Sequence, residues 1–102
     1  MKRSIETHDI SWRGFVIRIR YEAQWLGSTG PFSTAHLQVD TLVPERAPLP
    51  ITETGYRSHF ANAADIEADG GPVAFVIAWL DHAAQSQDWK DRTEKARQLT
   101  LF

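Results

Sequence analysis

The sequence contains no cysteine. This absence excludes a disulfide framework and a thiolate metal site. The sequence also lacks any apolar run that approaches the roughly 20 residues of a membrane-spanning helix. Its basic start over residues 1–6 is not followed by the apolar core of a signal peptide. We therefore expect a cytoplasmic protein with no membrane association.

A strong excess of charge of either sign is also missing. Eleven lysine and arginine residues stand against 13 aspartate and glutamate residues, which gives a formal net charge of −2. This balance provides no overall signal of nucleic-acid binding. The charge is uneven, however, because residues 1–20 are rich in arginine and lysine, whereas residues 61–86 contain acidic residues and no basic ones. This distribution favours a polarised surface.

The sequence does contain enough apolar material for one domain. Its 102 residues are 42% hydrophobic and include four tryptophans, so a core can form without covalent cross-links. Apolar residues alternate in the first half of the chain and recur at helical spacing in the second half. We therefore expect an α+β fold, in which a three- to four-stranded antiparallel meander is followed by two or three C-terminal helices.

Alternation predicts three strands, over residues 5–12, 15–21 and 34–42. In the third strand, the inward-facing residues are expected to be Ala35, Leu37 and Val39. The proline-rich segment that follows is expected to be an extended crossing segment, because proline is excluded from helix interiors. Residues 51–60 are ambiguous: Gly55 suggests a turn, and its flanks could form a short edge strand.

A two-residue turn at residues 13–14 would fix the pairing of the first two strands. It places Ile10 opposite Ile17 and Asp9 opposite Arg18, so apolar and charged side chains fall on different faces. Arginine is a poor first residue for such a turn. A bulged three-residue turn is therefore the alternative.

Two helices are expected before the last segment. Asn62 or Ala63 can begin a short helical turn that Gly70 ends in a left-handed conformation. Pro72 is then a suitable first residue for a longer helix over residues 73–85. Five apolar side chains of this helix form one stripe. Phe75, Trp79 and His82 form a second stripe. We expect the first stripe to pack on the sheet and the second to lie under a loop or a partner.

The segment after this helix is highly charged and predicts a last helix over residues 89–98, capped by Ser86 or Asp88. Three i,i+4 ion pairs support it: Asp88–Arg92, Lys90–Glu94 and Asp91–Lys95. Only Trp89 and Ala96 give it an apolar side. We therefore divide the chain into a body over residues 1–87, a charged helical arm over residues 88–97 and a C-terminal peptide over residues 98–102. The alternative is an ordinary surface helix.

Catalytic signals are weak. The four histidines, at positions 8, 36, 59 and 82, lack the spacing of a helical metal site. Residues 52–60 hold hydroxyl, imidazole, carboxylate and guanidinium groups, but neighbouring residues of a strand point to opposite faces. We expect this segment to be a recognition loop whose contacts are Thr54, Tyr56, Arg57 and His59. We predict no catalytic residue, no cofactor and no metal site, and we expect a protein that is not an enzyme.

Three arginines suggest a secondary hypothesis. Arg18 and Arg20 share the polar face of a predicted strand, and Arg13 lies near its turn. These side chains could contact the phosphates of a nucleic acid. The alternative is a solvated face on which Arg18 pairs with Asp9.

Residues 98–102 carry the most specific signal. Their sequence, QLTLF, resembles the pentapeptide by which bacterial replication and repair proteins bind the sliding clamp, whose common form is Gln-Leu-(Ser or Asp)-Leu-Phe. Four of the five positions match, and Thr100 departs from that form at its most tolerant position. A chance match has a probability on the order of 10⁻⁵ per window, or roughly 10⁻³ for a chain of this length. The alternative is an amphipathic segment that packs on its own domain.

The resemblance implies a role for each matching residue. Gln98 would bind polar groups at one end of the clamp groove, and Leu99 would cover a shallow patch. Leu101 and Phe102 would fill the deep apolar pocket. Their burial is worth roughly 3–6 kcal/mol before the cost of ordering the peptide. The isolated peptide should therefore bind with about micromolar affinity.

Together these signals favour a small adaptor or inhibitor that docks on the sliding clamp and acts in DNA replication or repair, or interferes with it. A second protein partner for the body is possible. The alternatives are an inhibitor of a host defence complex, in the manner of anti-CRISPR proteins, and a nucleic-acid-binding accessory protein. Residues 49–60 also resemble small uncharacterised proteins of bacterial plasmids and other mobile elements, which implies no activity.

Overall fold

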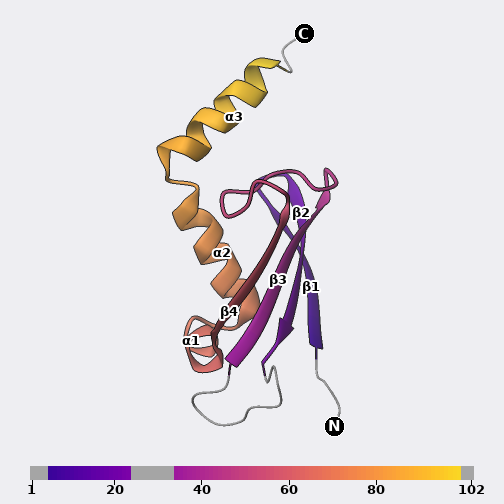
Figure 1. Ribbon diagram of the computed structural model, residues 1–102, viewed down its shortest axis with the longest axis vertical. Helices are drawn as coiled ribbons and strands as arrows, with labels where there is room; N and C mark the ends of the chain where they lie inside the picture. Colours follow the sequence, from indigo (N-terminus) through magenta and orange to yellow (C-terminus); the bar gives the residue numbers. More distant parts are fainter. Residues whose placement is uncertain (1–4, 24–33, 100–102) are drawn as a thin grey trace.

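The computed structural model describes residues 5–23 and 34–99, with side chains as far as Lys95 (Figure 1). These residues form four strands and then three helices: β1 (Ile5–Trp12), β2 (Phe15–Glu22), β3 (Thr34–Val43), β4 (Tyr56–Asn62), α1 (Ala63–Ala68), α2 (Pro72–Ala83) and α3 (Gln87–Leu99). The strands make one sheet in the order β1-β2-β3-β4, and every neighbouring pair is antiparallel. The α+β prediction is confirmed.

The hairpin of β1 and β2 has the expected register. Ile10 is paired with Ile17, and Asp9 is paired with Arg18. The connection is the two-residue turn, because Trp12 and Phe15 are paired directly. Arg13 and Gly14 have φ angles of 46° and 86°, and a type I′ turn requires positive values at both positions. The bulged alternative is therefore wrong, and Arg13 occupies a conformation that arginine seldom adopts.

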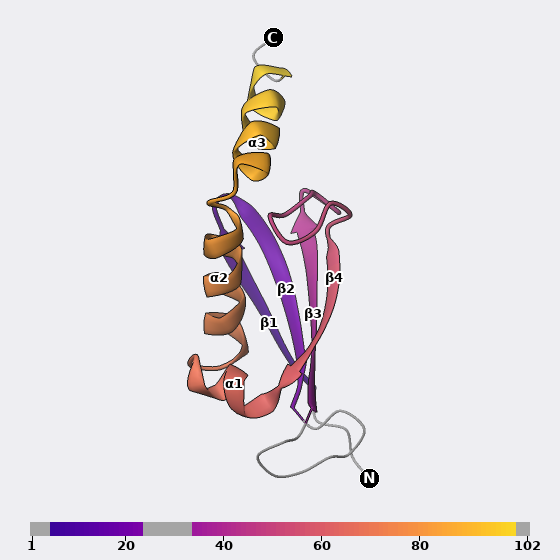
Figure 2. The same cartoon turned by 60° about the vertical axis from the view of Figure 1, so that its left-hand side comes forward.

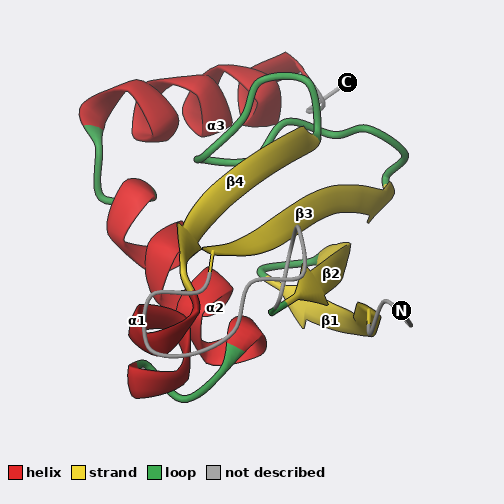
Figure 3. Cartoon of the chain, turned by 60° about the horizontal axis from the view of Figure 1, so that its bottom comes forward, coloured by secondary structure: helices red, strands yellow, loops and turns green. Residues whose placement is uncertain are grey.

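The two faces of the sheet differ in burial. One face, here called the helix face, packs against α1 and α2, which lie on the same side of the curved sheet (Figures 2 and 3). Ala35, Leu37 and Val39 lie on this face and are fully buried, as expected. Helices α1 and α2 contribute Ile66, Val76 and Leu80 to the same core, and Ala84, which directly follows α2, joins them. The opposite face, here called the far face, carries the charged and polar alternate residues, such as Arg18 and Arg20.

Residues 51–60 settle into a turn followed by an edge strand. Gly55 has a φ of 77° and precedes β4, which pairs only with β3 among the described strands. The pairing of β3 with β4 runs without interruption from Thr34–Asn62 to Asp40–Tyr56. Both outcomes considered for this segment are thus present.

Local signals at the helix ends agree with the structure. The Asn62 side chain accepts a hydrogen bond of 2.9 Å from the backbone N–H of Ala64 and caps α1. Gly70 and Gly71 have positive φ angles, and Pro72 begins α2. Helix α2 therefore starts one residue earlier and ends two residues earlier than the predicted range of 73–85.

Helix α3 leaves the body at an end of the sheet and extends away from it (Figures 1 and 2). The molecule measures 54 × 23 × 18 Å along its principal axes. The Ser86 hydroxyl accepts a hydrogen bond of 3.2 Å from the backbone N–H of Trp89, which confirms Ser86 as a cap. Within the described residues, no helix is long and apolar enough to span a membrane.

Candidate functional site

The first turn of α3 is fixed to the body by three aromatic rings. Trp89 is only 6% exposed, and its ring centroid lies 6.4 Å from that of Trp12 and 6.5 Å from that of Phe15. The indole N–H of Trp12 also donates a 2.9 Å hydrogen bond to Asp81 of α2. Sheet, α2 and α3 therefore meet at this cluster, which we call the arm anchor (Trp12, Phe15 and Trp89).

Arg92 adds a second attachment one turn later. Its guanidinium lies 5.7 Å from the ring centroid of Trp89, 3.1 Å from a carboxylate oxygen of Asp88 and 3.8 Å from one of Glu53. Glu53 belongs to the loop before β4, so this contact joins α3 to the body. The next three residues, 93–95, are exposed. The described side chains therefore attach α3 through its first two turns.

Two of the four predicted clamp-binding residues, Gln98 and Leu99, lie at the distal end of this helix. The backbone of Gln98 and Leu99 is helical, so α3 starts one residue earlier than the predicted arm and continues two residues into the pentapeptide. Leu101 and Phe102 lie outside the described residues, as does Thr100. Their contacts, and the division of the chain into body, arm and peptide, stay predictions.

The three arginines proposed for nucleic-acid contact do not form one patch. Arg18 donates hydrogen bonds of 2.9 and 3.1 Å to the two carboxylate oxygens of Asp9, and this bonding lowers the pKa of Asp9. Arg13 lies at the hairpin turn, 4.9 Å above the Trp12 ring and 3.7 Å from Asp81. Arg20 is exposed on the far face beside Arg18. Two of the three positive charges are therefore already matched by a carboxylate.

The predicted recognition loop is divided between the two faces of the sheet. Thr54 donates a hydrogen bond of 3.2 Å to the backbone carbonyl of Tyr56, so it stabilises the turn itself. Tyr56 points to the far face and is 41% exposed. Arg57 and His59 point to the helix face, because they are paired with the buried residues Val39 and Leu37.

On the helix face, Arg57 and His59 meet two aromatic residues of α2. The His59 ring lies 4.7 Å from the Trp79 ring and 6.0 Å from the Phe75 ring, centroid to centroid. The Arg57 guanidinium lies 5.6 Å above the Trp79 ring. Burial, and then the positive charge of Arg57, lowers the pKa of His59. His59 is therefore neutral at pH 7 and acts as a flat aromatic surface in this cluster, which we call the β4 cluster (Arg57, His59, Phe75 and Trp79).

The far face of β4 is also aromatic. The rings of His36 and Phe60 are stacked, with centroids 4.5 Å apart and an interplanar angle of 15°. His36 and Ser58 are joined by a hydrogen bond of 2.7 Å. Phe60 is 48% exposed. Strand β4 therefore carries exposed or half-exposed rings on both of its faces.

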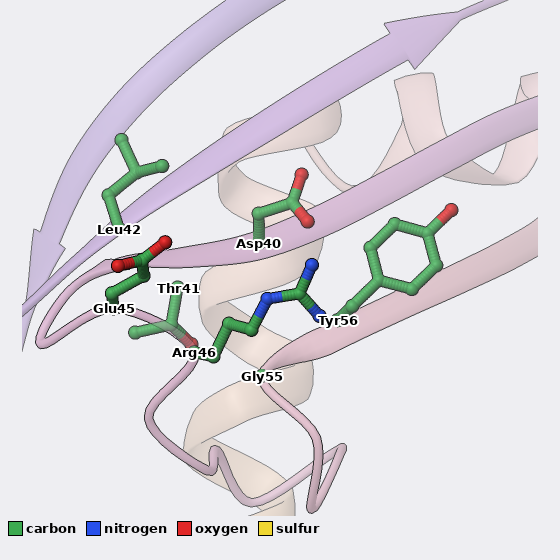
Figure 4. A pocket seen from close by; sticks show the side chains of 7 residues that line it. All are labelled: Asp40, Thr41, Leu42, Glu45, Arg46, Gly55 and Tyr56. Carbon is green, nitrogen blue, oxygen red and sulfur yellow. The ribbon is translucent and has the colours of Figure 1, made fainter.

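A pocket lies at the end of β3 and β4 (Figure 4). Its cavity volume is about 330 Å³, and it is lined by Asp40, Thr41, Leu42, Glu45, Arg46, Gly55 and Tyr56. The Arg46 side chain lies between those of Asp40 and Tyr56 (Figure 4). Arg46 has a φ of 56° and its backbone packs directly on Gly55. A guanidinium, two carboxylates and a phenol provide binding groups for a small polar molecule, but none of these groups is paired as a nucleophile with a base.

Metal binding has no support within the part of the chain that the structure describes. No group of three or more histidine, aspartate or glutamate side chains there could hold a metal ion. Three of the four histidines instead make ring contacts or local hydrogen bonds, namely His8, His36 and His59.

Comparison with known families places most of the chain in a family. The family model described as the KlcB third domain matches residues 5–89. The chain belongs to the KlcB third-domain family. This family is plasmid-associated. The match covers the sheet, α1 and α2, and it ends at Trp89 of the arm anchor. No curated protein and no solved structure matches the chain.

Sequence reasoning missed the β4 cluster and the pocket. Phe75 and Trp79 form a recognisable stripe on the helix, but their contact with His59 depends on how the sheet curves round α2. Arg46 gives no local signal, because a positive φ at a residue other than glycine cannot be recognised from its type. The signal that was available is Gly55, whose backbone approaches Arg46 so closely that a side chain would not fit.

Proposed function

We propose that the chain is a non-enzymatic adaptor or inhibitor that binds the bacterial sliding clamp through residues 98–102. The observation that carries this proposal is a clamp-type sequence at the distal end of a helix whose described attachments lie in its first two turns. An attachment of this kind holds the base of the helix and leaves its other end to a partner.

The arm acts as a short rigid spacer. Gln98 follows Trp89 by nine residues, which corresponds to about 13 Å of helix. The exposed charges of the arm keep the helix solvated, and the pair of Asp88 with Arg92 stabilises its first turns. Gln98, the first residue of the pentapeptide, is thereby held away from the arm anchor.

Docking needs a local change at the end of α3. The peptide would bind as an extended strip, whereas the backbone of Gln98 and Leu99 is helical in the free chain. The last turn of a helix frays readily, because its final carbonyl groups have no helical partners. Burial of Leu101 and Phe102, worth roughly 3–6 kcal/mol, offsets the cost of unwinding and ordering the peptide. The expected affinity is therefore about micromolar.

Occupancy of the clamp groove is compatible with both proposed roles, the inhibitor and the adaptor. A bound chain excludes any other protein that uses the same groove, so it interferes with replication at high concentration. At low concentration it can bring a second protein, bound to the body, to the clamp. A direct role of the arginines in nucleic-acid binding ranks lower, because Asp9 and Asp81 already lie against two of them.

Titration calorimetry tests the proposal. The full chain is titrated against a purified bacterial sliding clamp, beside a chain that lacks residues 98–102 and the double variant Leu101→Ala/Phe102→Ala. We expect micromolar binding by the full chain and a loss of at least about thirtyfold for both variants. Thr100→Ser is the matched control, since it restores the common form of the motif and should bind at least as well. Equal binding with and without the pentapeptide contradicts the proposal.

A further inference from the structure

The outer edge of β4 is not paired with another described strand, although at its first residue the Tyr56 carbonyl accepts hydrogen bonds from the hydroxyls of Thr52 and Thr54. In the strand order β1-β2-β3-β4, no described strand pairs with β4 on the side away from β3, and β4 forms a border of the sheet in Figure 2. An edge strand presents backbone N–H and C=O groups that can pair with another extended chain. The usual protections against such pairing are proline, lysine and bulges. Strand β4, of sequence YRSHFAN, contains no proline or lysine, and its register is continuous.

Aromatic side chains flank this edge on both faces. On the helix face lies the β4 cluster, in which Trp79 is contacted by both Arg57 and His59. On the far face lie Tyr56 and Phe60, which are 41% and 48% exposed. Side chains of a strand alternate between faces. An added strand would therefore place successive side chains against aromatic surfaces on both sides.

The charge of the β4 edge indicates what kind of chain could pair with it. Arg57 is exposed and lies over the Trp79 ring, and within the described residues no carboxylate lies within ion-pair distance of it. A guanidinium that stacks on an indole keeps its N–H groups available in its own plane for a carboxylate. His59 is neutral at pH 7, because burial and Arg57 lower its pKa. The strand therefore offers one positive charge and no negative charge.

We propose that the outer edge of β4 binds an extended peptide segment of a protein partner by strand addition, with an acidic residue beside Arg57 and apolar residues that cover Trp79 on one face and Phe60 on the other. The backbone supplies the general affinity, and the flanking side chains supply the choice of sequence. This surface is separate from residues 98–102. A partner can therefore occupy it while the pentapeptide is bound elsewhere.

A random peptide library tests the proposal with the full chain. The immobilised protein is panned against displayed peptides of about ten residues, a length that covers β4, and the enriched peptides are synthesised and titrated by fluorescence anisotropy. We expect enriched sequences with an acidic residue among alternating apolar ones. Arg57→Glu should weaken their binding by at least about tenfold, and exchange of the acidic residue of the peptide for lysine should restore binding to that variant.

The matched control is Arg20→Glu, which makes the same change of charge on β2, away from the edge. It should bind the acidic peptides as the unaltered chain does. Amide chemical shifts of the labelled protein then locate the peptide, and the largest changes should fall in residues 56–62. The absence of enriched peptides, equal binding by Arg57→Glu, or shifts confined to another surface would overturn the proposal. So would sedimentation that shows the edge to be occupied by a second copy of the chain.

Discussion

Tyr21 is a titratable residue within the hydrophobic core. Its side chain is 2% exposed, and its hydroxyl donates a 3.2 Å hydrogen bond to a carboxylate oxygen of Glu67. Burial, together with the negative charge of Glu67, raises the pKa of Tyr21 to about 12. The hydroxyl of the buried Tyr21 therefore stays protonated, and neutral, until the pH approaches about 12.

This position predicts a loss of stability in alkali. The pKa of an unfolded tyrosine is about 10, so the contribution of Tyr21 is fully present below pH 10 and is lost as the pH rises towards about 12. Tyr21→Phe should cost about 1 kcal/mol at pH 7 through the lost hydrogen bond and should flatten the alkaline decline. Urea unfolding between pH 7 and about 11.5 measures both effects. The exposed Tyr56→Phe is the control. An unchanged alkaline profile in Tyr21→Phe would show that another group causes the decline.

At Gly55, the type of a single residue controls the local backbone structure. A Cβ atom placed there would lie 2.6 Å from the backbone carbonyl carbon of Arg46, and the φ of 77° is also unfavourable for other residues. Gly55→Ala should therefore cost about 3 kcal/mol. Gly14→Ala is the matched control, because Gly14 has a φ of 86° but open space around its Cβ position, and should cost about 1 kcal/mol. Denaturant unfolding compares them, and equal costs would mean that the contact with Arg46 relaxes freely.

At the scale of the elements, the junction of α3 with the body is the decisive contact. Trp89→Ala removes the central ring of the arm anchor and should lower the free energy of unfolding by about 3 kcal/mol. Lys90→Ala, a change of an exposed neighbour, should stay within about 0.5 kcal/mol. Urea unfolding measures these values, and backbone relaxation of α3 should show faster motion in Trp89→Ala. A small loss of stability together with an unchanged α3 would show that other contacts hold the arm.

The elements also show what local sequence can and cannot predict. The register of β1 and β2 follows from alternation, because a shift of β1 by one residue would turn its apolar side chains, such as Ile10, to the far face. The caps at Asn62 and Ser86 follow from short-range hydrogen bonding. The β4 cluster does not follow, because Trp79 and His59 meet only through the packing of α2 on the sheet. The predicted helix over residues 89–98 ends one residue before α3 does, since Leu99 suits a helix as well as an extended peptide.

At the scale of the whole molecule, two possible contact regions lie on different parts of one elongated structure. The described end of α3 carries Gln98 and Leu99, and the outer edge of β4 borders the sheet (Figures 1 and 2). The model of the KlcB third-domain family ends at Trp89, so the family relationship concerns the body and not the pentapeptide. If both proposed regions bind proteins, the chain has the form that an adaptor needs.

The most direct measurement is a residue-resolved titration of the isotope-labelled full chain with an unlabelled bacterial sliding clamp, followed through its amide signals. We predict that the signals of residues 98–102 shift or broaden first, that Gln98 and Leu99 lose their helical shifts, and that the strand signals keep their positions. Changes confined to the sheet, or no changes at clamp concentrations well above the micromolar range, would contradict clamp binding through the C-terminal residues.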